Sequence, residues 1–452
     1  MKKINKSIVI TSFFAILFIT QSFGQEGTTK YRRSSLSTIL IESPSLGKSR
    51  DMVVNAYNAN PFPDKYNKHN SGAGAFNLDE MEVTTEDFLA SGFYQDTLRK
   101  TMEMLKASLN PLRELRYLSA DSSSAIQEPS KKQTRQIYLD KYIRENNLAK
   151  SMAGVWFNRT DDGTMNWDLV KERGMYSASA EDKDQASDAA LGEDLLLDFE
   201  LLGNTYSVFN EMEFYENEPW VRIIRDEAKI ALAEQGLTGI LYEKAAAKID
   251  QVYEKTKVGY TVKCNSFLYK LDWDENIANT VNKYFFNDEQ EIDKIQLWDT
   301  TSVFNLSFVG KITSGSIVTF KIGETRTEEE IIDLQIRRTM DNALAKLQKK
   351  YVQFRPVSPI SSVEPLTARI GMKEGLEGGE KFEILEMGWN DIGIPEWKSV
   401  GKLSLDKKAQ VWDNRQGAEV VLAEDGSSLP EFTTFKGGKK AMPGMHYIRL
   451  VK

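Results

Sequence analysis

The most regular pattern of apolar and polar positions in the chain lies in residues 328–351. Apolar side chains recur there at the spacing of one helix face. They are Ile331, Leu334, Met340, Leu344, Leu347 and Tyr351. Lysines follow in the final turn, where they lie at the negative end of the helix dipole. The pattern therefore predicts a long amphipathic helix over this segment.

Upstream of that helix, predicted strands alternate with predicted helices. Short apolar runs predict strands over residues 37–42, 205–215, 260–273, 303–309 and 316–322. Helical spacing predicts helices over residues 51–58, 87–109, 135–152, 168–176, 182–199, 220–255 and 274–286. Gly310 and Gly315 favour a hairpin between the last two strands, and Gly236 and Gly239 favour a break in the helix over 220–255. This alternation predicts a helix-rich α+β centre.

The pattern changes after Arg355-Pro356. Short apolar runs separated by glycine turns predict strands over residues 366–370, 381–385, 398–405, 410–412, 419–422 and 447–451. Strands at this spacing are typical of a small antiparallel barrel or sandwich. The fold class is therefore α+β with several domains, in which the helix-rich centre is followed by a β-rich module.

The first residues have the order of a secretory signal peptide. Lys2 and Lys3 precede an uncharged run over residues 8–20, and small residues at Ser22 and Gly24 predict cleavage after Gly24. The run is shorter than a bilayer-spanning helix, and no later stretch is apolar enough to span a membrane. We therefore expect a periplasmic or outer-membrane-associated protein, with an extracellular location as an alternative.

Composition shifts divide the chain into four parts. Residues 1–24 are the signal peptide, and residues 25–132 form an N-terminal arm and helical region. That region ends in a serine-rich linker over 119–132, which has no apolar periodicity. Residues 133–352 form the central α+β domain, and residues 353–452 form the C-terminal β-rich module.

Charge and rare residues limit the chemistry. The 452-residue chain has a net charge of −8, which disfavours nucleic acid and anionic lipid as partners. Its two histidines, His69 and His446, are expected on the surface or in turns. Two histidines in such positions disfavour a histidine-dependent catalytic triad and a zinc site with several histidine ligands. Cys264 is the single cysteine and is expected to be an inert strand residue.

One loop has partial calcium-binding spacing. Asn158, Thr160 and Asp162 precede Gly163 as in the first half of an EF-hand loop, but Leu169 stands where a bidentate glutamate is required. A polar turn is therefore favoured, with calcium as a weak alternative. No catalytic residue and no cofactor is assigned, and no phosphate-binding loop motif occurs.

The aromatic residues beside this loop leave two interpretations open. Trp156, Phe157 and Trp167 would stack on a sugar if they were exposed. They would form core if they were buried, and the core interpretation is favoured.

Two sequence blocks lie within residues 150–310. The first is Trp156-Phe157-Asn158-Arg159, followed by Gly163, Leu169, Glu172, Arg173 and Gly174. The second runs from Glu193-Asp194-Leu195 to Leu202-Gly203-Asn204-Thr205. Together they resemble secreted Bacteroidota proteins that have no assigned function. The resemblance implies an exported, envelope-associated protein and transfers no catalytic residue. The β-rich module is also loosely similar to small barrels that close some periplasmic assembly proteins.

These observations favour a cell-envelope protein without catalytic activity, with a structural or assembly-accessory role and envelope proteins as partners. A carboxylate-dependent glycan hydrolase and a glycan- or peptide-binding module remain alternatives. A cleft with two close carboxylates of raised pKa would favour the hydrolase. A shallow aromatic platform would favour binding, and a large exposed apolar patch would favour assembly.

Overall fold

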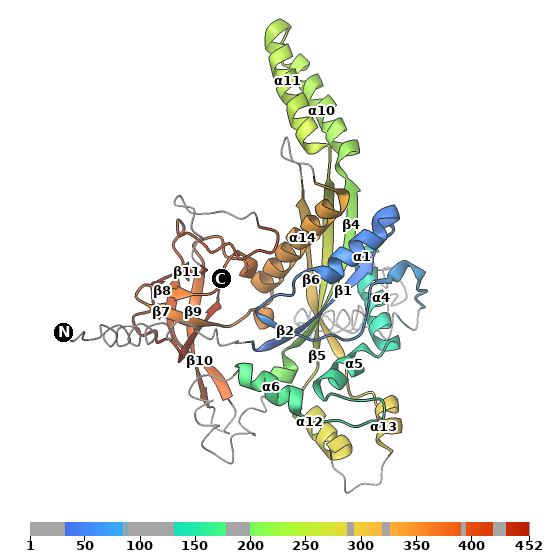
Figure 1. The fold of residues 1–452 in the computed structure, drawn as a ribbon, viewed down its shortest axis with the longest axis vertical. Coiled ribbons are helices and arrows are strands. Elements are labelled where there is room, and N and C mark those ends of the chain that lie inside the picture. The colour runs from blue at the N-terminus through green and yellow to red at the C-terminus, as the bar shows by residue number, and fades with distance from the viewer. Residues whose placement is uncertain are drawn as a thin grey trace, which may run out of the picture.

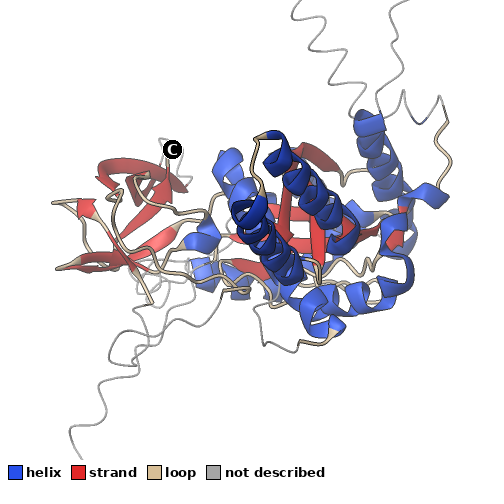
Figure 2. Ribbon diagram, turned by 90° about the horizontal axis from the view of Figure 1, so that it is seen from above, coloured by secondary structure: helices blue, strands red, loops and turns tan. Residues whose placement is uncertain are grey.

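A computed structural model describes residues 32–84, 87, 131–177, 199–286, 293–318, 326–389, 395–418 and 431–451. The predicted signal peptide and the predicted strand over 419–422 lie outside these residues. So do nearly all of the predicted helices over 87–109 and 182–199 and of the linker over 119–132. The described part is α+β, as predicted, with a mixed central sheet and a separate β-rich module (Figures 1 and 2).

The central sheet combines parallel and antiparallel pairs. Its strands are β1 (Ser34–Glu42), β2 (Tyr66–Lys68), β3 (Phe76–Asn77), β4 (Thr205–Glu216), β5 (Tyr260–Leu271) and β6 (Leu306–Ile317). The order is β2-β1-β4-β5-β6, with β3 also paired to β1. Strands β2, β3 and β4 run parallel to β1, whereas β4, β5 and β6 form an antiparallel meander.

Helices cover both faces of the central sheet. They are α1 (Arg50–Ala59), α4 (Lys131–Glu145), α5 (Leu148–Trp156), α6 (Asp168–Ser177), α9 (Phe199–Gly203), α12 (Glu275–Val281), α13 (Lys294–Thr300) and α14 (Glu328–Lys350). Alternation along β1 separates the faces, because successive side chains point to opposite sides. Leu40 packs with α1 and α14, whereas Ile39 packs with Leu139 and Ile143 of α4.

The predicted long helix is confirmed as α14. A capping box at its start joins Thr327 and Glu330, and three glutamates occupy its first turn. Three other predictions need correction. The segment over 410–412, predicted as a strand, has no regular secondary structure. The helix over 135–152 is two helices, α4 and α5, because Asn147 adopts a left-handed conformation between them. The predicted hairpin over 303–322 is the single strand β6.

The glycines that suggested a turn instead serve close packing within β6. A Cβ at Gly315 would lie 2.5 Å from the Val262 carbonyl oxygen of the neighbouring strand. A Cβ at Gly310, where φ is 158°, would overlap the Tyr351 ring. A register shift in the pairing of β5 with β6 falls beside Gly310. Glycine is required at these positions because no side chain fits there.

The helical pair α10 (Asn217–Glu234) and α11 (Gly239–Thr256) connects β4 to β5. The predicted break is confirmed, since Gly236 and Gly239 both have positive φ in the connecting turn. Figure 1 shows the pair projecting beyond the end of the sheet, away from the other helices. No residue of α11 is buried. We call residues 217–256 the helical arm.

The C-terminal module is a nearly closed, seven-stranded antiparallel sheet with the shape of a barrel. Its strands are β7 (Ser358–Val363), β8 (Leu366–Ala368), β9 (Lys381–Trp389), β10 (Pro395–Ser404), β11 (Thr433–Thr434), β12 (Lys436–Gly437) and β13 (His446–Leu450). The order is β11-β8-β7-β13-β9-β10-β12. Only Phe435 separates β11 from β12, so one short segment pairs with both ends of the row and nearly closes it.

The barrel has a core of its own. Every residue of its buried apolar cluster lies between Ile360 and Leu450, and Phe382 packs edge-to-face on Phe435. The barrel is joined to the centre by polar contacts, among them two hydrogen bonds from Arg355 to the carbonyls of Gln348 and Lys349 at the end of α14. The core changes between Phe354, which packs on Tyr66 and Tyr206 of the central sheet, and Ile360, the first residue of the barrel cluster.

We expect residues 353–452, expressed alone, to fold, because their core needs no side chain from the central sheet. Circular dichroism should show a β-type spectrum, and heating should give one cooperative transition. A helical spectrum or the lack of a cooperative transition would remove the boundary.

Candidate functional site

The helical arm carries the largest set of exposed apolar side chains in the described part of the chain. Its exposed members are Ile223, Ile224, Ile230, Ile240, Leu241 and Val252. Ile240 and Leu241 near the tip are 70% and 71% exposed. Single apolar residues on a surface are ordinary, but two of these six, Ile224 and Val252, line one groove together.

A groove of about 470 Å³ runs between α10 and α11 near the base of the arm. Trp220 and Ile224 line it from α10, Ile249 and Val252 line it from α11, and Ile317 at the end of β6 continues it onto the sheet. Its surface is almost entirely apolar. The groove is therefore suited to an apolar ridge and offers little to a polar ligand.

Polar interactions hold the two helices of the arm together. Lys229 of α10 forms an ion pair with Asp250 of α11 at 2.6 Å. The hydroxyl of Tyr253 donates to Glu218 at 2.9 Å, and the Arg225 guanidinium lies 4.4 Å from the centre of the Tyr253 ring. These contacts stabilise the pair, while the groove residues Ile224 and Val252 stay more than half exposed.

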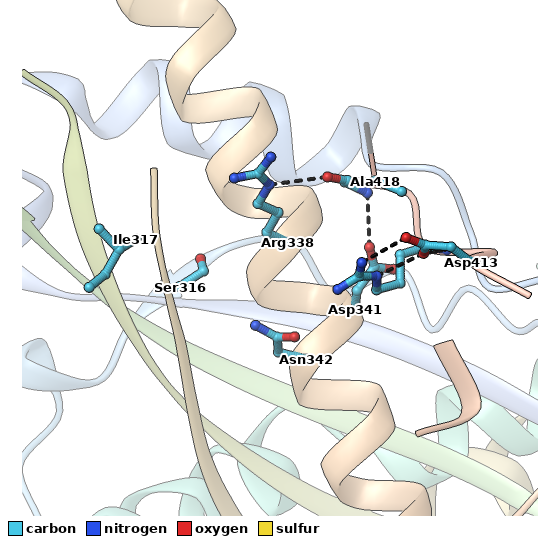
Figure 3. Close-up of a pocket in the computed structure, with 9 residues that line it drawn as sticks. Ser316, Ile317, Arg338, Asp341, Asn342, Asp413 and Ala418 are labelled. Atoms are coloured by element: carbon cyan, nitrogen blue, oxygen red, sulfur yellow. Dashed lines mark hydrogen bonds and ion pairs between the residues drawn. The ribbon is translucent and has the colours of Figure 1, made fainter. Parts of the chain in front are cut away.

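A second, polar pocket of about 460 Å³ lies between α14 and the barrel loop over 413–418 (Figure 3). Arg338 of α14 donates to the Gly417 carbonyl at 3.1 Å, and the Gly417 amide donates to Asp341 at 2.9 Å. Arg415 in turn donates to both carboxylate oxygens of Asp413. The pocket thus contains two arginines and two aspartates.

The two aspartates of this pocket have pKa values shifted in opposite directions. Burial raises the pKa of Asp341, and the hydrogen bonds from Arg415 lower the pKa of Asp413. Opposite shifts are a mark of acid–base pairs. Here, however, Asp341 holds the backbone of the barrel loop and Asp413 is bound by Arg415. The hydrogen bonds of Arg338 and Asp341 to Gly417 therefore join α14 to the barrel, and we call this group of contacts the polar latch.

A buried polar network lies beneath the edge of the central sheet. Arg173 donates to His69 Nδ1 at 2.8 Å, to Ser35 Oγ at 3.0 Å and to the Lys68 carbonyl at 2.7 Å. The other ring nitrogen, His69 Nε2, donates to the Met152 carbonyl at 2.8 Å. This tautomer follows because arginine has only donors, so Nδ1 must accept. The guanidinium also lies over the Trp156 ring.

The expectation of a surface or turn position was wrong for both histidines. His69 is fully buried by Trp156 and Arg173. Burial and the nearby Arg173 charge lower the pKa of His69 to about 3, so its imidazole is neutral at physiological pH. His446 is also buried, in β13, and accepts a hydrogen bond from the Met442 amide. The local sequence contains no signal for the burial of His69, because Arg173 is one of several charged residues in α6.

Other predicted positions are confirmed. Cys264 is buried in β5, and burial raises the pKa of its thiol to about 12, which leaves it unreactive. Trp156 and Phe157 are fully buried, and Trp167 packs on Phe157 and Phe286. These three aromatic residues therefore belong to the core.

The loop with partial calcium spacing is a hydrogen-bonded turn. Asn158 donates to Asn166, and Asp162 accepts from the Thr160 hydroxyl and the Thr164 amide. The hydrogen bond from Thr160, with that from Thr164, lowers the pKa of Asp162 to about 2. Across the described residues, no group of three or more His, Cys, Asp or Glu side chains is arranged to hold a metal.

Calcium should not change the stability of the protein, because the oxygens of Thr160 and Asp162 already bond within the turn. We expect the same melting temperature in millimolar calcium chloride and in excess EDTA. Magnesium chloride at equal ionic strength is the control. A rise in melting temperature that calcium alone produces would contradict this expectation.

Comparisons with known proteins add no assignment. No protein-family model matches the chain, and a search of curated proteins finds no match. Among the described residues, no helix combines the length and apolarity needed to cross a bilayer. The arm, its groove and the polar latch are thus the features from which a function can be argued.

Proposed function

We propose that this is an exported cell-envelope protein without catalytic activity, with a structural or assembly-accessory role. The observation that carries the proposal is the helical arm, which holds exposed isoleucine and leucine side chains away from the body of the protein. Exposed apolar side chains on a rigid, projecting element are suited to docking and have no evident use in catalysis.

Export is supported by the leader sequence over residues 1–24 and by the resemblance of residues 150–310 to secreted Bacteroidota proteins. The proposed location is the periplasm or the outer membrane, with an extracellular location as the alternative, and other envelope proteins are the proposed partners. The rival functions have less support. The two aspartates of the polar pocket are engaged in the latch, and the aromatic residues near Asn158 are packed in the core.

The arm can be removed cleanly, which allows a direct test. Strands β4 and β5 stay paired up to Glu216 and Tyr260, and the Asn217 amide donates to the Gly259 carbonyl. Replacing residues 218–258 by Asn-Gly should therefore leave a tight β-hairpin on an unchanged sheet.

Wild type and this shortened variant should be used as baits in cross-linked envelope extracts of the producing organism. We expect the wild type to retain a defined set of envelope proteins that the shortened variant loses at equal folded amount. The double variant Asp341→Asn with Arg415→Ala disrupts the polar pocket. It should retain the same envelope proteins as the wild type. Equal recovery by both baits, or glycan hydrolysis by either one, would overturn the proposal.

A further inference from the structure

Helix α14 contacts both the central sheet and the barrel, through different sides. Its apolar side packs on the central sheet through Ile336, Met340 and Leu347. Four other positions approach the barrel or the residue that leads into it, and these are Arg338, Asp341, Ala345 and Gln348. Steps of three, four and three residues place the four on one side of the helix. We call them the barrel stripe.

The barrel stripe has its first anchor in the middle of α14. There the polar latch bonds the helix to the backbone of Gly417. Further along the helix, η6 (Met372–Glu374) packs closely on α14. A Cβ at Gly375, where φ is 86°, would lie 3.2 Å from the Ala345 carbonyl oxygen. Glycine at this position therefore lets the barrel approach the helix backbone.

Arg355 forms the second anchor, at the end of α14. Its guanidinium donates to the carbonyls of Gln348 and Lys349, which lie in the last turn and have no partner within the helix. It also donates to the carbonyls of Leu450 and Val451 at the end of the barrel strand β13. One side chain can bind both segments because a guanidinium carries five N–H donors in a fixed plane.

Apolar packing adds little to these anchors in the described part of the chain. The apolar cluster of the barrel shares no residue with those of the central sheet. Further contacts across the interface are polar, such as the ion pairs of Lys349 with Glu377 and of Lys373 with Asp64. A polar interface permits relative motion of two domains, whereas a large apolar interface would prevent it.

Opening such an interface exchanges its hydrogen bonds for hydrogen bonds with water. The guanidinium of Arg355 and the four carbonyls that it binds can all be hydrated, so their separation costs little free energy. The closed position also buries Asp341 and Gln348 of the barrel stripe, which are 4% and 2% exposed. Burial of these polar groups offsets part of what the anchors contribute. The closed position therefore depends on the anchors.

We infer that the barrel is a hinged module, which the two anchors at Gly417 and Arg355 hold against α14. Residues 356–357 are the hinge, since they lie between Arg355 and the first residue of β7, Ser358. When both anchors are broken, the barrel turns away from α14 as a folded body and exposes the barrel stripe. This device involves no residue of the helical arm, so its failure and the failure of the proposed function are separate results.

The test is the distance between nitroxide labels on the centre and the barrel of the purified protein, measured by pulsed electron paramagnetic resonance. Asn279→Cys in α12 and Ser399→Cys in β10 provide the labelling sites, because both positions are exposed. Cys264 is fully buried and stays unlabelled. With both anchors intact, we expect one narrow distance distribution. Arg338→Ala with Arg355→Ala should make it about twice as wide or wider.

The matched control removes one arginine from α14 and one from the barrel. Arg337 pairs with Asp333 inside α14, and Arg449 pairs with Glu383 inside the barrel, so neither ion pair crosses the interface. Arg337→Ala with Arg449→Ala should keep the narrow distribution. Circular dichroism should show the same folded content in all these proteins.

A narrow distribution after loss of both anchors would overturn the inference. So would a broad distribution with the anchors intact, or equal broadening by the two pairs of arginine substitutions. If the variant Arg338→Ala with Arg355→Ala does not fold, Arg338→Lys with Arg355→Lys decides in the same way. Lysine keeps both charges but cannot bind two backbone segments at once, so this variant should also broaden the distribution.

Discussion

Replacing Arg173 by alanine should lower the free energy of unfolding by about 2 to 4 kcal/mol, because it leaves buried hydrogen-bond acceptors without their donor. Arg173 is 7% exposed and donates to His69, Ser35 and Lys68. Without it, an imidazole nitrogen and a carbonyl oxygen lose their donor inside the protein. The Trp156 ring also loses the guanidinium stacked over it.

Urea unfolding, followed by tryptophan fluorescence, measures this effect. Arg173→Lys should recover part of the loss, since an ammonium keeps the charge but cannot reach all three acceptors at once. Arg222→Ala on the arm is the matched control, because that side chain is 56% exposed. Its replacement should change the free energy of unfolding by less than about 0.5 kcal/mol. Equal losses for Arg173→Ala and Arg222→Ala would show that the network does not stabilise the fold.

The second large effect is a loss of stability in acid that depends on His69. Burial and the charge of Arg173 keep the pKa of His69 at about 3, against 6.5 for an exposed histidine. Above pH 6.5, neither the folded nor the unfolded state binds the proton, so the full contribution is present. As the pH falls from 6.5 towards 3, only the unfolded state binds the proton, and stability falls.

Between pH 7 and pH 4 this single group should cost about 3 kcal/mol of unfolding free energy. Carboxylates titrate in the same range, so the comparison must be with His69→Gln, which keeps a donor for the Met152 carbonyl but cannot be protonated. The variant should be less stable at pH 7 and should lose about 3 kcal/mol less than the wild type on acidification. Parallel stability curves for the two proteins would refute the role of His69.

The sequence predicted those helices and strands whose caps and apolar patterns come from neighbouring residues in the chain. Helix α14 has its own cap and apolar stripe, and Asp274 caps α12 through the Ile277 amide, so both could be predicted without knowledge of the fold. Strand β5 and the barrel strand β9 were found for the same reason, since their apolar residues alternate or run together between turn residues.

The wrong predictions involve partners that are distant in sequence. Gly310 and Gly315 have the composition of a turn, yet Tyr351 and Val262 on neighbouring elements explain them. His69 lies in a polar, glycine-containing stretch, and only Arg173, 104 residues later, buries it in a bonded network. Spacing along one segment cannot indicate which distant residue will approach it.

The candidate site was only partly predictable. The break at Gly236 and Gly239 marks two helices, but their sequence does not say that the pair will leave the body of the protein. That depends on where β4 ends and β5 begins, because α10 starts directly after β4 and α11 ends just before β5. Exposure of Ile224 and Val252 is therefore a property of the assembled sheet.

The segment over 433–437 has a consequence for a chain with a single cysteine. Unpaired strand edges invite addition of strands from other molecules, which leads to aggregation. In the barrel, Thr433 and Thr434 pair with β8, and Lys436 and Gly437 pair with β10. Strands β8 and β10, at opposite ends of the sheet, are therefore both hydrogen-bonded to the segment over 433–437. Because the chain has a single cysteine, no disulfide within it can hold the barrel closed. Backbone hydrogen bonds of the segment over 433–437 instead occupy the strand edges that could otherwise pair with another molecule.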